Sequence, residues 1–545
     1  MLGITTGGFK SLGRAISMRY RFLLTKPGRP PVLLLLAAVS VAAVLLLSPS
    51  YLLLRTLGAG PEVWDLLIRT RVLEILGRTL LLVGVVTGAS ILLAIPLAWL
   101  TVRTDLPFKT VWSVATALPL VIPSYVAGFI VVVTLGPKGM LQGLMEGMFG
   151  LERLPDISGF PGAALTLTLL SYPYVLLTVR AAFLRLDPSL EEISRGLGRN
   201  PWATFFGVIL PSLRPAIAAG GLLVALYALA DFGAVSLLRF ETFTWAIFLQ
   251  YESALDRGLA AALSLVLIAV ALTLVGGEAF TRGHWRYYRS GSGATRPHAP
   301  VRLGRWRWPA LALCAAVVMA SLVLPMSVLA YWVFRGVSAG EPLLLLWEAA
   351  RNSVYVSAIA ATQAPAALPI AALSVRFPGM LSGTLERIAY IGFALPGIAI
   401  ALSLVFFGAN YAPLLYQTTG LLVLGYVVLF VSAAVGAVRS SFLQVSPNVE
   451  EAARGLGRTP LGVFASVTLP LVRPGIVSGA ALVFLLTMKE LPATLILSPI
   501  GFQTLATSIW SAASEAFFAQ AAAPALLLIL TSSIPLAFLL LRGRQ

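Results

Sequence analysis

Cysteine and histidine are almost absent from this 545-residue chain. The one cysteine, Cys314, has no partner for an internal disulfide bond and indicates nothing about the redox compartment. His284 and His298 both fall in one basic segment, so a histidine-based metal site has no ligands available. No phosphate-binding loop of the form G-x-x-x-x-G-K-S/T occurs either, so the chain cannot hold a nucleotide by that route.

Charge is also scarce. Charged residues are 11% of the chain, whereas a typical soluble domain has about 25%. Hydrophobic residues are 58% of the chain, and the mean hydropathy is +0.90. This composition predicts an integral membrane protein whose surroundings are the lipid bilayer. We attribute the net charge of +17 to membrane topology and expect no nucleic-acid partner.

Apolar runs of about 20 residues recur along the chain, and a helix of that length crosses a hydrocarbon core of roughly 30 Å. The alternation typical of membrane strands is absent, so we expect helices. The sequence therefore predicts an all-α polytopic membrane protein with twelve spans, six in each half. The first six lie near residues 31–54, 78–102, 111–135, 160–184, 215–238 and 259–281, and the second six near residues 309–334, 351–375, 386–408, 419–441, 474–497 and 521–541.

Basic residues set the expected orientation of these spans. Most Lys and Arg residues fall in segments that share one side of the membrane if the N-terminus and the C-terminus are both cytoplasmic. We divide the chain into a first six-helix half at residues 1–281, a basic cytoplasmic linker at residues 282–308 and a second six-helix half at residues 309–545. The Gly, Ser, Pro and Arg content of the linker is typical of a flexible tether.

One polar segment occurs twice. Residues 187–220 and residues 446–479 lie 259 positions apart and share Glu-Glu, Arg-Gly-Leu-Gly-Arg and Leu-Pro-x-x-Arg-Pro in the same order. This identity indicates that one unit was duplicated and fused. Because six spans separate the copies, both lie on the same side of the membrane, and the halves are parallel repeats rather than inverted ones.

The repeat extends beyond the polar segment. Arg103 matches Arg376 at an offset of 273, and Ala117-Leu118-Pro119 matches Ala394-Leu395-Pro396 at an offset of 277. The offset between the two halves then falls from 277 to 259. This change predicts that a loop near residues 136–160 of the first half is roughly 18 residues longer than its counterpart in the second half. An insertion of this kind belongs in a surface loop.

Each polar segment is predicted to begin with a short helix. Asp187 and Ser446 are good N-caps, and a proline follows each at the first helical position. The two acids that come next lie near the positive end of the helix dipole. Gly198 and Gly457 suit the left-handed position that ends the helix. We therefore expect a glycine corner at the same place in both copies.

A second short helix is predicted after each corner. Asn200-Pro201 and Thr459-Pro460 repeat the start with a cap and a proline. Pro211 and Pro470 are expected to end this helix, because proline interrupts a helix. The unit has two interpretations: it is a structural elbow that returns the chain to the membrane, or it is a docking surface. Its retention in two copies favours the docking surface.

These residues resemble a known family. Glu191-Glu192, the Arg-Gly-Leu-Gly-Arg of residues 195–199 and the final Leu-Pro-x-x-Arg-Pro are similar to the cytoplasmic signature loop of binding-protein-dependent ABC importer permeases. The common form places alanine after the acids; Glu451-Ala452 keeps it and Glu192-Ile193 does not. The fused two-times-six layout and residues 230–238 resemble the iron(III) transporter permeases. The resemblance implies a type I ABC importer permease fold in a bacterial inner membrane.

The resemblance also implies partners. The chain would be a transport subunit for iron(III), not an enzyme, and it would bind no cofactor itself. Two separate ABC ATPase subunits would use ATP, and an extracytoplasmic substrate-binding protein would deliver the cargo. The ATPase-docking loops implied by the family comprise Glu191, Glu192, Arg195, Gly196, Gly198, Arg199, Glu450, Glu451, Arg454, Gly455, Gly457 and Arg458.

Two acids, Asp231 and Glu490, fall at equivalent positions inside predicted spans. Each is about 16 residues past the proline that opens its span, roughly 24 Å along a helix and in the outer half of the bilayer. An acid at that depth faces a cavity or a partner. In one interpretation Glu490 pairs with Lys489 and Asp231 bonds to a neighbouring helix; in the other the two acids line the route of a cation. Arg180 and Arg439 also match across the halves and are expected to snorkel.

Other functions stay open at this point. Thiamine, sulfate, molybdate, phosphonate or a polyamine could replace iron(III) as cargo, because the binding protein often selects the cargo in such systems. An ion-coupled secondary transporter would need buried coupling carboxylates in broken helices, and the membrane acids here are few. A membrane enzyme would need clustered His, Asp, Glu or Ser at a membrane face, and the sequence offers no such cluster.

Overall fold

The structure is a computed structural model that describes residues 30–542, except residues 59, 138, 151–154, 187, 253–256, 284–299 and 341–344. Regular structure in these residues is helical, apart from one isolated parallel bridge between Thr104 and Val301. The prediction of an all-α fold is confirmed. The predicted cap Asp187, and residues 284–299 of the predicted linker, lie outside the described residues.

Most helices of the first half recur in the same order in the second half, and α3 and α7 are additions of the first half among the described residues. The first half contains α2 (Val32–Leu57), α3 (Pro61–Ile68), α4 (Thr70–Arg103), α5 (Lys109–Ala115), η1 (Leu118–Val121), α6 (Ser124–Leu135), α7 (Met140–Phe149), α8 (Phe160–Arg185), α9 (Pro188–Gly196), α10 (Pro201–Thr204), η2 (Phe205–Ile209), α11 (Leu210–Ala230), α12 (Gly233–Leu237), α13 (Phe243–Glu252) and α14 (Arg257–Gly283). The second half contains η3 (Gly304–Trp306), α15 (Arg307–Val318), η4 (Met319–Val323), α16 (Leu324–Ser338), α17 (Leu345–Thr362), η5 (Ala364–Ala366), α18 (Ala367–Arg376), α19 (Met380–Ala394), α20 (Gly397–Tyr411), α21 (Thr419–Gln444), α22 (Pro447–Gly455), α23 (Pro460–Val463), η6 (Phe464–Thr468), α24 (Leu469–Met488), α25 (Pro492–Leu497), α26 (Leu505–Ser514) and α27 (Phe518–Arg542). The order from α8 to α12 recurs from α21 to α25, as parallel repeats require.

Eleven helical stretches of the described chain are long and apolar enough to cross a membrane. With the shorter apolar helix α20 they correspond to the twelve predicted runs. The third run of each half is divided, into α5, η1 and α6 in the first half and into α19 and α20 in the second. Pro119, Pro123 and Pro396 lie at these breaks, because proline has no backbone N–H and disfavours helix at the residue before it.

The fifth membrane helix of each half starts earlier than predicted. One helical stretch runs from Pro201 to Ala230 and its counterpart from Pro460 to Met488. The expectation that Pro211 and Pro470 end a short helix is wrong. The π turns η2 and η6 come immediately before these residues, and their wider hydrogen-bond spacing accommodates a residue that has no N–H to donate. Both stretches also end before residues 238 and 497, where the predicted spans end.

Pro123 and Pro396 occupy equivalent places in the two halves. Each is the N-cap residue of a membrane helix, α6 in one half and α20 in the other. Their offset is 273, so the match predicted at 277 through Pro119 is wrong. A three-residue identity is too short to set an alignment against the start of a helix. The offset changes after α6, where the longer connection of the first half carries α7, within the predicted insertion at residues 136–160.

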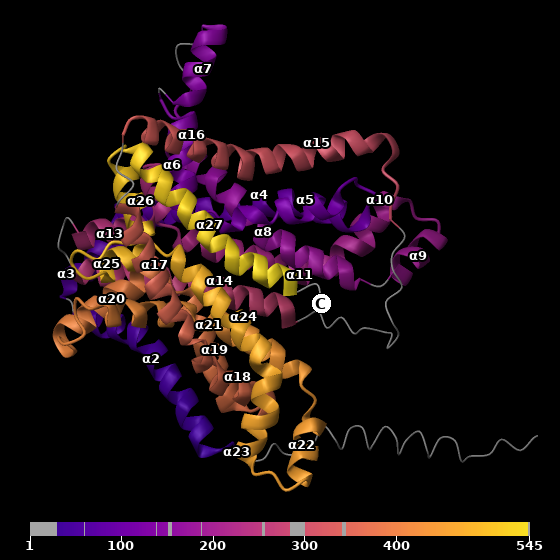
Figure 1. Cartoon of the computed structure of the whole chain (residues 1–545), viewed down its shortest axis with the longest axis vertical. Coiled ribbons are helices and arrows are strands. Elements are labelled where there is room, and N and C mark those ends of the chain that lie inside the picture. Colours follow the sequence, from indigo (N-terminus) through magenta and orange to yellow (C-terminus); the bar gives the residue numbers. More distant parts are fainter. Residues whose placement is uncertain are drawn as a thin grey trace, which may run out of the picture.

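The first helix of each half packs against the opposite half. Helix α2 contacts α18, α19 and α20, and α16 with the π turn η4 contacts α6 and α8. Ser403 in α20 donates a hydrogen bond to the backbone carbonyl of Ser48 in α2 at 2.9 Å. Figure 1 shows α2 beside α18 and α19, with α15 and α16 running across the first half. This exchange interlocks the halves and buries apolar surface between them.

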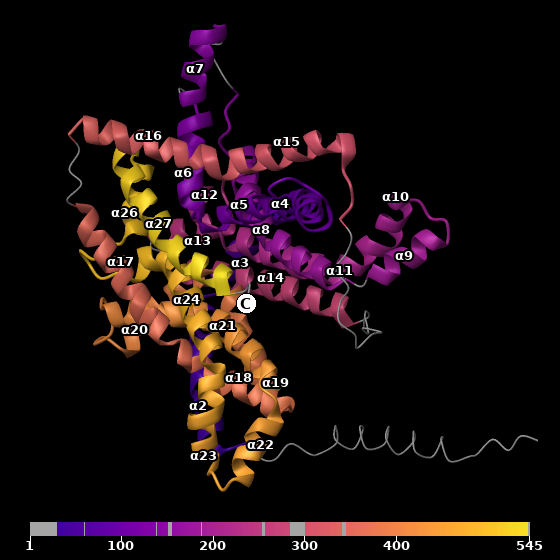
Figure 2. The same ribbon diagram turned by 45° about the vertical axis from the view of Figure 1, so that its right-hand side comes forward.

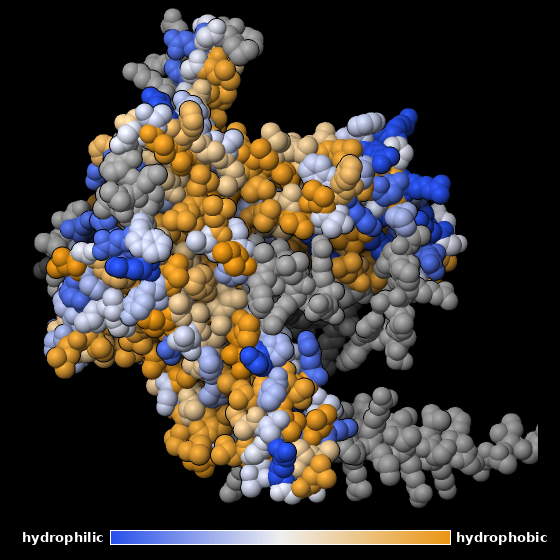
Figure 3. Space-filling model, in the orientation of Figure 1, coloured by the Kyte–Doolittle hydropathy of each residue, from blue (hydrophilic) through white to orange (hydrophobic). Residues whose placement is uncertain are grey.

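The two halves form arms that diverge. Figures 1 and 2 both show α9 and α10 at the end of one arm and α22 and α23 at the end of the other. The arms join near α13, α25 and α26 (Figure 1). Figure 3 shows apolar side chains over the long helices of the visible face, and hydrophilic residues over α9 and α10. Helices with apolar flanks and polar ends are suited to a lipid bilayer.

Candidate functional site: paired elbows and a central cavity

The duplicated polar segment forms two elbows at the ends of the arms. The first elbow comprises α9, α10 and η2, at residues 188–209, and the second comprises α22, α23 and η6, at residues 447–468. Gly198 has a φ of +80° and Gly457 a φ of +83°. This left-handed conformation favours glycine, since a Cβ atom would be strained there. The predicted glycine corners are therefore confirmed.

Side-chain caps start the helices of the elbows. Asn200 accepts a hydrogen bond from a backbone N–H three residues later at 2.7 Å, and Thr459 accepts the equivalent bond at 3.2 Å. Ser446 accepts a bond at 3.4 Å from the second residue of α22. A proline follows each cap at the first helical position, which needs no N–H donor. The predicted caps Asn200, Thr459 and Ser446 are therefore confirmed.

A buried ion pair fixes the first elbow to the second membrane helix. Glu191 in α9 accepts a hydrogen bond from Arg103, the last residue of α4. Arg195, one helical turn after Glu191, donates to the same carboxylate at 3.0 Å. The Arg103 side chain is only 5% exposed and the Glu191 side chain 13%. Removing one partner of a buried pair costs about 3–5 kcal/mol, so the pair holds α9 firmly against α4.

The second elbow has the same anchor. Glu450 in α22 accepts hydrogen bonds from Arg376, the last residue of α18, and from Thr468, both at 3.0 Å. Arg454 lies 4.0 Å from the same carboxylate. Glu450 is buried, whereas the acid that follows it, Glu451, is exposed. The first acid of each pair therefore faces the membrane helices, and the second faces outward.

The other residues implied in docking lie on the outer surface of the elbows. They are Glu192, Arg195, Gly196, Gly198, Arg199, Glu451, Arg454, Gly455, Gly457 and Arg458, all of which are exposed. Large apolar side chains accompany them. Leu197 is 77% exposed and Trp202 73% in the first elbow, and Leu456 is 86% exposed in the second. Exposed apolar side chains next to charged ones are typical of a surface that binds another protein.

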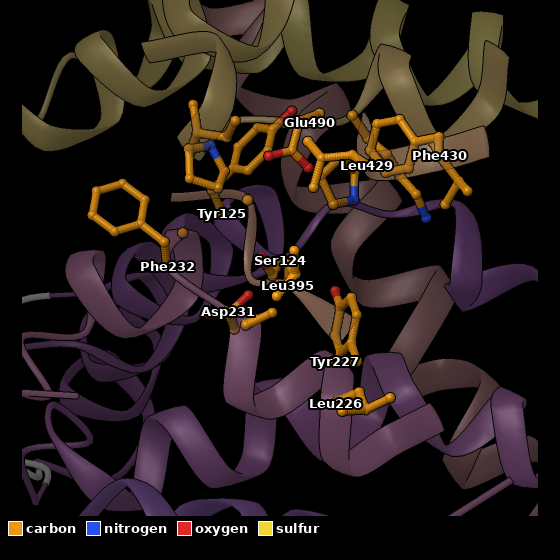
Figure 4. Close-up of a pocket in the computed structure, with 18 of the residues that line it drawn as sticks. Ser124, Tyr125, Leu226, Tyr227, Asp231, Phe232, Leu395, Leu429, Phe430 and Glu490 are labelled. Atoms are coloured by element: carbon orange, nitrogen blue, oxygen red, sulfur yellow. The ribbon is translucent and has the colours of Figure 1, made fainter. Parts of the chain in front are cut away.

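A cavity of about 170 Å³ lies between the two halves. Its walls are built where α11 and α24 end, where the short helices α12 and α25 begin, and at the N-termini of α6 and α20. Both predicted pathway acids line it, so the structure brings together two residues 259 positions apart. Figure 4 shows Asp231 beside Ser124 and Tyr227, and Glu490 beside Tyr125.

Each acid starts a short helix in the cavity wall. Asp231 Oδ1 accepts backbone N–H groups of Ala234 at 3.1 Å and Val235 at 3.3 Å, and Glu490 Oε1 accepts that of Ala493 at 3.2 Å. The preceding membrane helices end just before these acids. The prediction that the acids stand within continuous helices is wrong, because a carboxylate that accepts backbone N–H groups begins a new helix.

Ser124 and Gly397 are equivalent residues that contact the two acids. Ser124 lies beside the Asp231 carboxylate at the cavity wall (Figure 4). A Cβ atom on Gly397 would lie 2.5 Å from Glu490 Oε1, so any larger residue would shift this carboxylate. The longer acid, Glu490, therefore faces the smaller residue, Gly397, and the shorter acid, Asp231, lies beside Ser124.

The local interpretation of the two acids differs from the structure. The carboxylate of Asp231 accepts its hydrogen bonds from Ala234 and Val235, in the helix that follows it, and lies beside Ser124 of α6 (Figure 4). Lys489, however, donates to the backbone carbonyl of Leu120 at 2.8 Å, and no pair with Glu490 exists among the ion pairs of the described residues. Leu120 belongs to η1 of the first half, so this hydrogen bond joins the two halves.

Comparison with known proteins identifies the architecture. A family model described as binding-protein-dependent transport system inner membrane component matches residues 87–281 and residues 363–542, one segment in each half. The chain belongs to this family of permeases. Its fold is accordingly the expected type I ABC importer permease fold, and the chain is a multi-pass membrane transport subunit.

Individual relatives agree with the family. The permease is 38% identical over 515 residues to the Fe(3+)-transport system permease protein FbpB 2 of Haemophilus influenzae, which covers 93% of this chain and 98% of the relative. It is 25% identical over 450 residues to the ferric transport system permease protein FbpB of Actinobacillus pleuropneumoniae, covering 78% and 65%. The molybdenum transport system permease protein ModB of Escherichia coli is 30% identical over 198 residues, covering 35% and 85%.

Arg180 and Arg439 were predicted to extend their charged groups toward the membrane surface. In the structure both instead contact groups of the protein. Arg180 donates to the backbone carbonyl of Ser113 at 2.7 Å. Arg439 lies 2.9 Å from Glu386. The sequence predicted a membrane-interface role because it did not show which groups the two arginines contact. Those groups, Ser113 and Glu386, belong to helices that are distant in sequence. Arg180 joins α8 to α5, and Arg439 joins α21 to α19, so each arginine contacts the first segment of the divided third run of its own half.

Sequence reasoning also missed the anchors of the permease. Arg103 and Arg376 matched in the alignment, but nothing in the pattern paired them with Glu191 and Glu450. The exposed leucines of the elbows carried a signal that could have been used, because large apolar residues stand among charges in both copies. The Tyr125 side chain of the cavity carried no such signal.

Proposed function

We propose that this permease forms the membrane pathway of an ATP-driven importer for iron(III). The observation that carries the proposal is its similarity, over 98% of the relative's length, to a permease named for Fe(3+) transport. A cationic cargo agrees with the two acids, Asp231 and Glu490, in the wall of the central cavity. We assign both residues to the translocation pathway, because buried acids in membrane proteins mark ion routes.

In this proposal each elbow docks one ABC ATPase subunit. The elbows and both chain termini then face the cytoplasm, and a substrate-binding protein delivers iron at the opposite face. Leu197 in the first elbow and Leu456 in the second would insert among the charged groups of an ATPase groove. The ATPases bind and hydrolyse ATP, whereas this chain binds no cofactor.

The two anchors would transmit movement from the ATPases to the membrane helices. Arg103 ends α4 and Arg376 ends α18, so a partner that displaces α9 or α22 also displaces a membrane helix of the same half. The elbow ends of the arms stand apart in Figure 2, which is the arrangement of a pathway open to the cytoplasm. ATP-driven approach of the two elbows would open the opposite face, a rigid-body form of alternating access.

Reconstitution tests the proposal. The permease is placed in proteoliposomes with its ATPase subunits, the binding protein is added outside, and uptake of radioactive ferric iron is measured. We expect accumulation that requires ATP inside and the binding protein outside. ATP-driven uptake of molybdate or sulfate, with no uptake of iron, would overturn the cargo and keep the importer class. Iron uptake without any ATPase would overturn the mechanism.

A further inference from the structure

The central cavity contains a buried hydroxyl without a hydrogen-bond partner. Tyr125, in the first turn of α6, is 2% exposed, and its hydroxyl bonds to no group of the described residues. Other buried tyrosines are satisfied: Tyr172 donates to the Thr116 carbonyl at 2.7 Å, and the Tyr426 hydroxyl lies 2.8 Å from that of Thr494. An unsatisfied buried hydroxyl costs about 1–3 kcal/mol. A residue that carries this cost at a cavity wall is placed to meet a ligand.

A carboxylate oxygen lies beside this hydroxyl. Figure 4 shows Tyr125 and Glu490 next to each other at the cavity wall. Glu490 uses Oε1 to start α25, and within the described chain its Oε2 accepts no hydrogen bond. A carboxylate has about four acceptor positions, so most of the capacity of Glu490 stays available. Asp231 of the other half supplies a second carboxylate to the same cavity.

The charges of the cavity favour a cation. Two carboxylates, Asp231 and Glu490, oppose one ammonium, that of Lys489. The ammonium is held by the Leu120 carbonyl, and Leu120 does not line the cavity. An anionic ferric chelate would meet two like charges, whereas a free cation would meet two opposite ones. The volume of about 170 Å³ admits an ion with several water molecules.

We propose that the central cavity coordinates the transported iron(III) ion itself, released from any chelator, through the phenol oxygen of Tyr125 and the free oxygen of Glu490. This inference rests on the proposed iron(III) cargo. Hard cations prefer oxygen ligands of this kind. On coordination the phenol releases its proton to solvent, and the oxidation state of the iron does not change. Among the described residues no group of three or more His, Cys, Asp or Glu offers a competing site.

The test uses the absorption spectrum of the complex. Coordination of iron(III) by a phenolate produces a visible charge-transfer band, which carboxylate and water ligands do not produce. The purified permease–ATPase complex is titrated with ferric nitrilotriacetate, and the visible band is recorded. We expect a saturable band in the wild-type complex, no band in Tyr125→Phe, and an unchanged band in the control Tyr172→Phe, which removes a buried tyrosine hydroxyl away from the cavity. Uptake of ferric iron by Tyr125→Phe should fall on the order of tenfold.

A second variant keeps the inference testable if Tyr125→Phe does not assemble. Glu490→Gln changes a neighbouring ligand, so the band should shift in wavelength and saturate only at higher iron concentration. Wild-type complex that transports iron but shows no band, or a Glu490→Gln band identical to that of wild type, overturns the coordination site and leaves the proposed function intact. Wild-type complex that transports no iron overturns the proposed function, and the coordination site with it.

Discussion

Arg103, the last residue of α4, is paired with Glu191 of α9 inside the protein, although 88 residues separate them in sequence. Arg376 and Glu450 repeat the relationship in the other half at 3.0 Å. The duplicated acids therefore have divided roles, because the first acid of each pair holds the elbow and the second is left exposed. An elbow held in this way moves as one body with its membrane helices.

Breaking the first anchor should uncouple ATP hydrolysis from transport. We expect Arg103→Ala to destabilise the first half by about 3 kcal/mol, because the Glu191 carboxylate loses its buried partner and keeps only the exposed Arg195. Iron uptake per ATP hydrolysed should fall strongly. Thermal unfolding and uptake by the reconstituted complex measure both effects. For the stability measurement the matched control is Arg195→Ala, which removes an exposed contact to the same carboxylate and should cost about 1 kcal/mol or less. Equal losses of thermal stability in the two variants would show that burial of the pair has no importance.

The exposed leucine of the first elbow should matter for assembly and not for folding. Leu197 is 77% exposed, so Leu197→Asp should leave the thermal stability of the isolated permease unchanged within about 0.5 kcal/mol. Retention of the ATPase subunits during purification should decrease, because an aspartate would be buried against the partner. Leu414→Asp is the control, since Leu414 is 93% exposed in the connection between α20 and α21. Loss of the ATPase in both variants would contradict the assignment.

A side chain at Gly397 should displace the Glu490 carboxylate. In Gly397→Ala the new Cβ atom would lie 2.5 Å from Glu490 Oε1 and displace the carboxylate, so uptake should fall while the complex still assembles. Gly383→Ala is the control, because a Cβ atom there meets no atom within 4 Å. Alanine at a helical glycine generally stabilises by a few tenths of a kcal/mol to about 1 kcal/mol. Normal uptake by Gly397→Ala would mean that the position of Glu490 is not critical.

Neutralising both acids of the cavity should reduce transport. Asp231→Asn combined with Glu490→Gln preserves side-chain size and retains an oxygen for each helix cap, so the ATPase should still bind. Uptake of ferric iron should fall well below that of either single variant, because the cavity loses both negative charges. Uptake assays beside quantification of the copurified ATPase check this. Unchanged uptake in the double variant would end the assignment of the acids to the pathway.

The parts of the site predicted correctly depend on local geometry. Gly198 and Gly457 were identified because a left-handed corner favours glycine, and Asn200 and Thr459 because a cap acts on a backbone group three residues away. The prediction that Pro211 ends a short helix was wrong because the outcome at this residue does not depend on local geometry alone. Whether a proline ends a helix or is absorbed by a π turn depends on how the whole stretch packs, and that information is not local.

The sequence by itself determined the membrane location, the helical spans, the duplication and the two elbows, because hydropathy, periodicity and capping act over a few residues to a few tens of residues. Only the tertiary structure decided that Glu191 faces Arg103, that Asp231 and Glu490 share one cavity, and that the Tyr125 hydroxyl is left without a partner. These relationships join residues from helices far apart in the chain. Their energies come from burial and from the pairing of charges and hydrogen bonds, which exist only after the helices have packed.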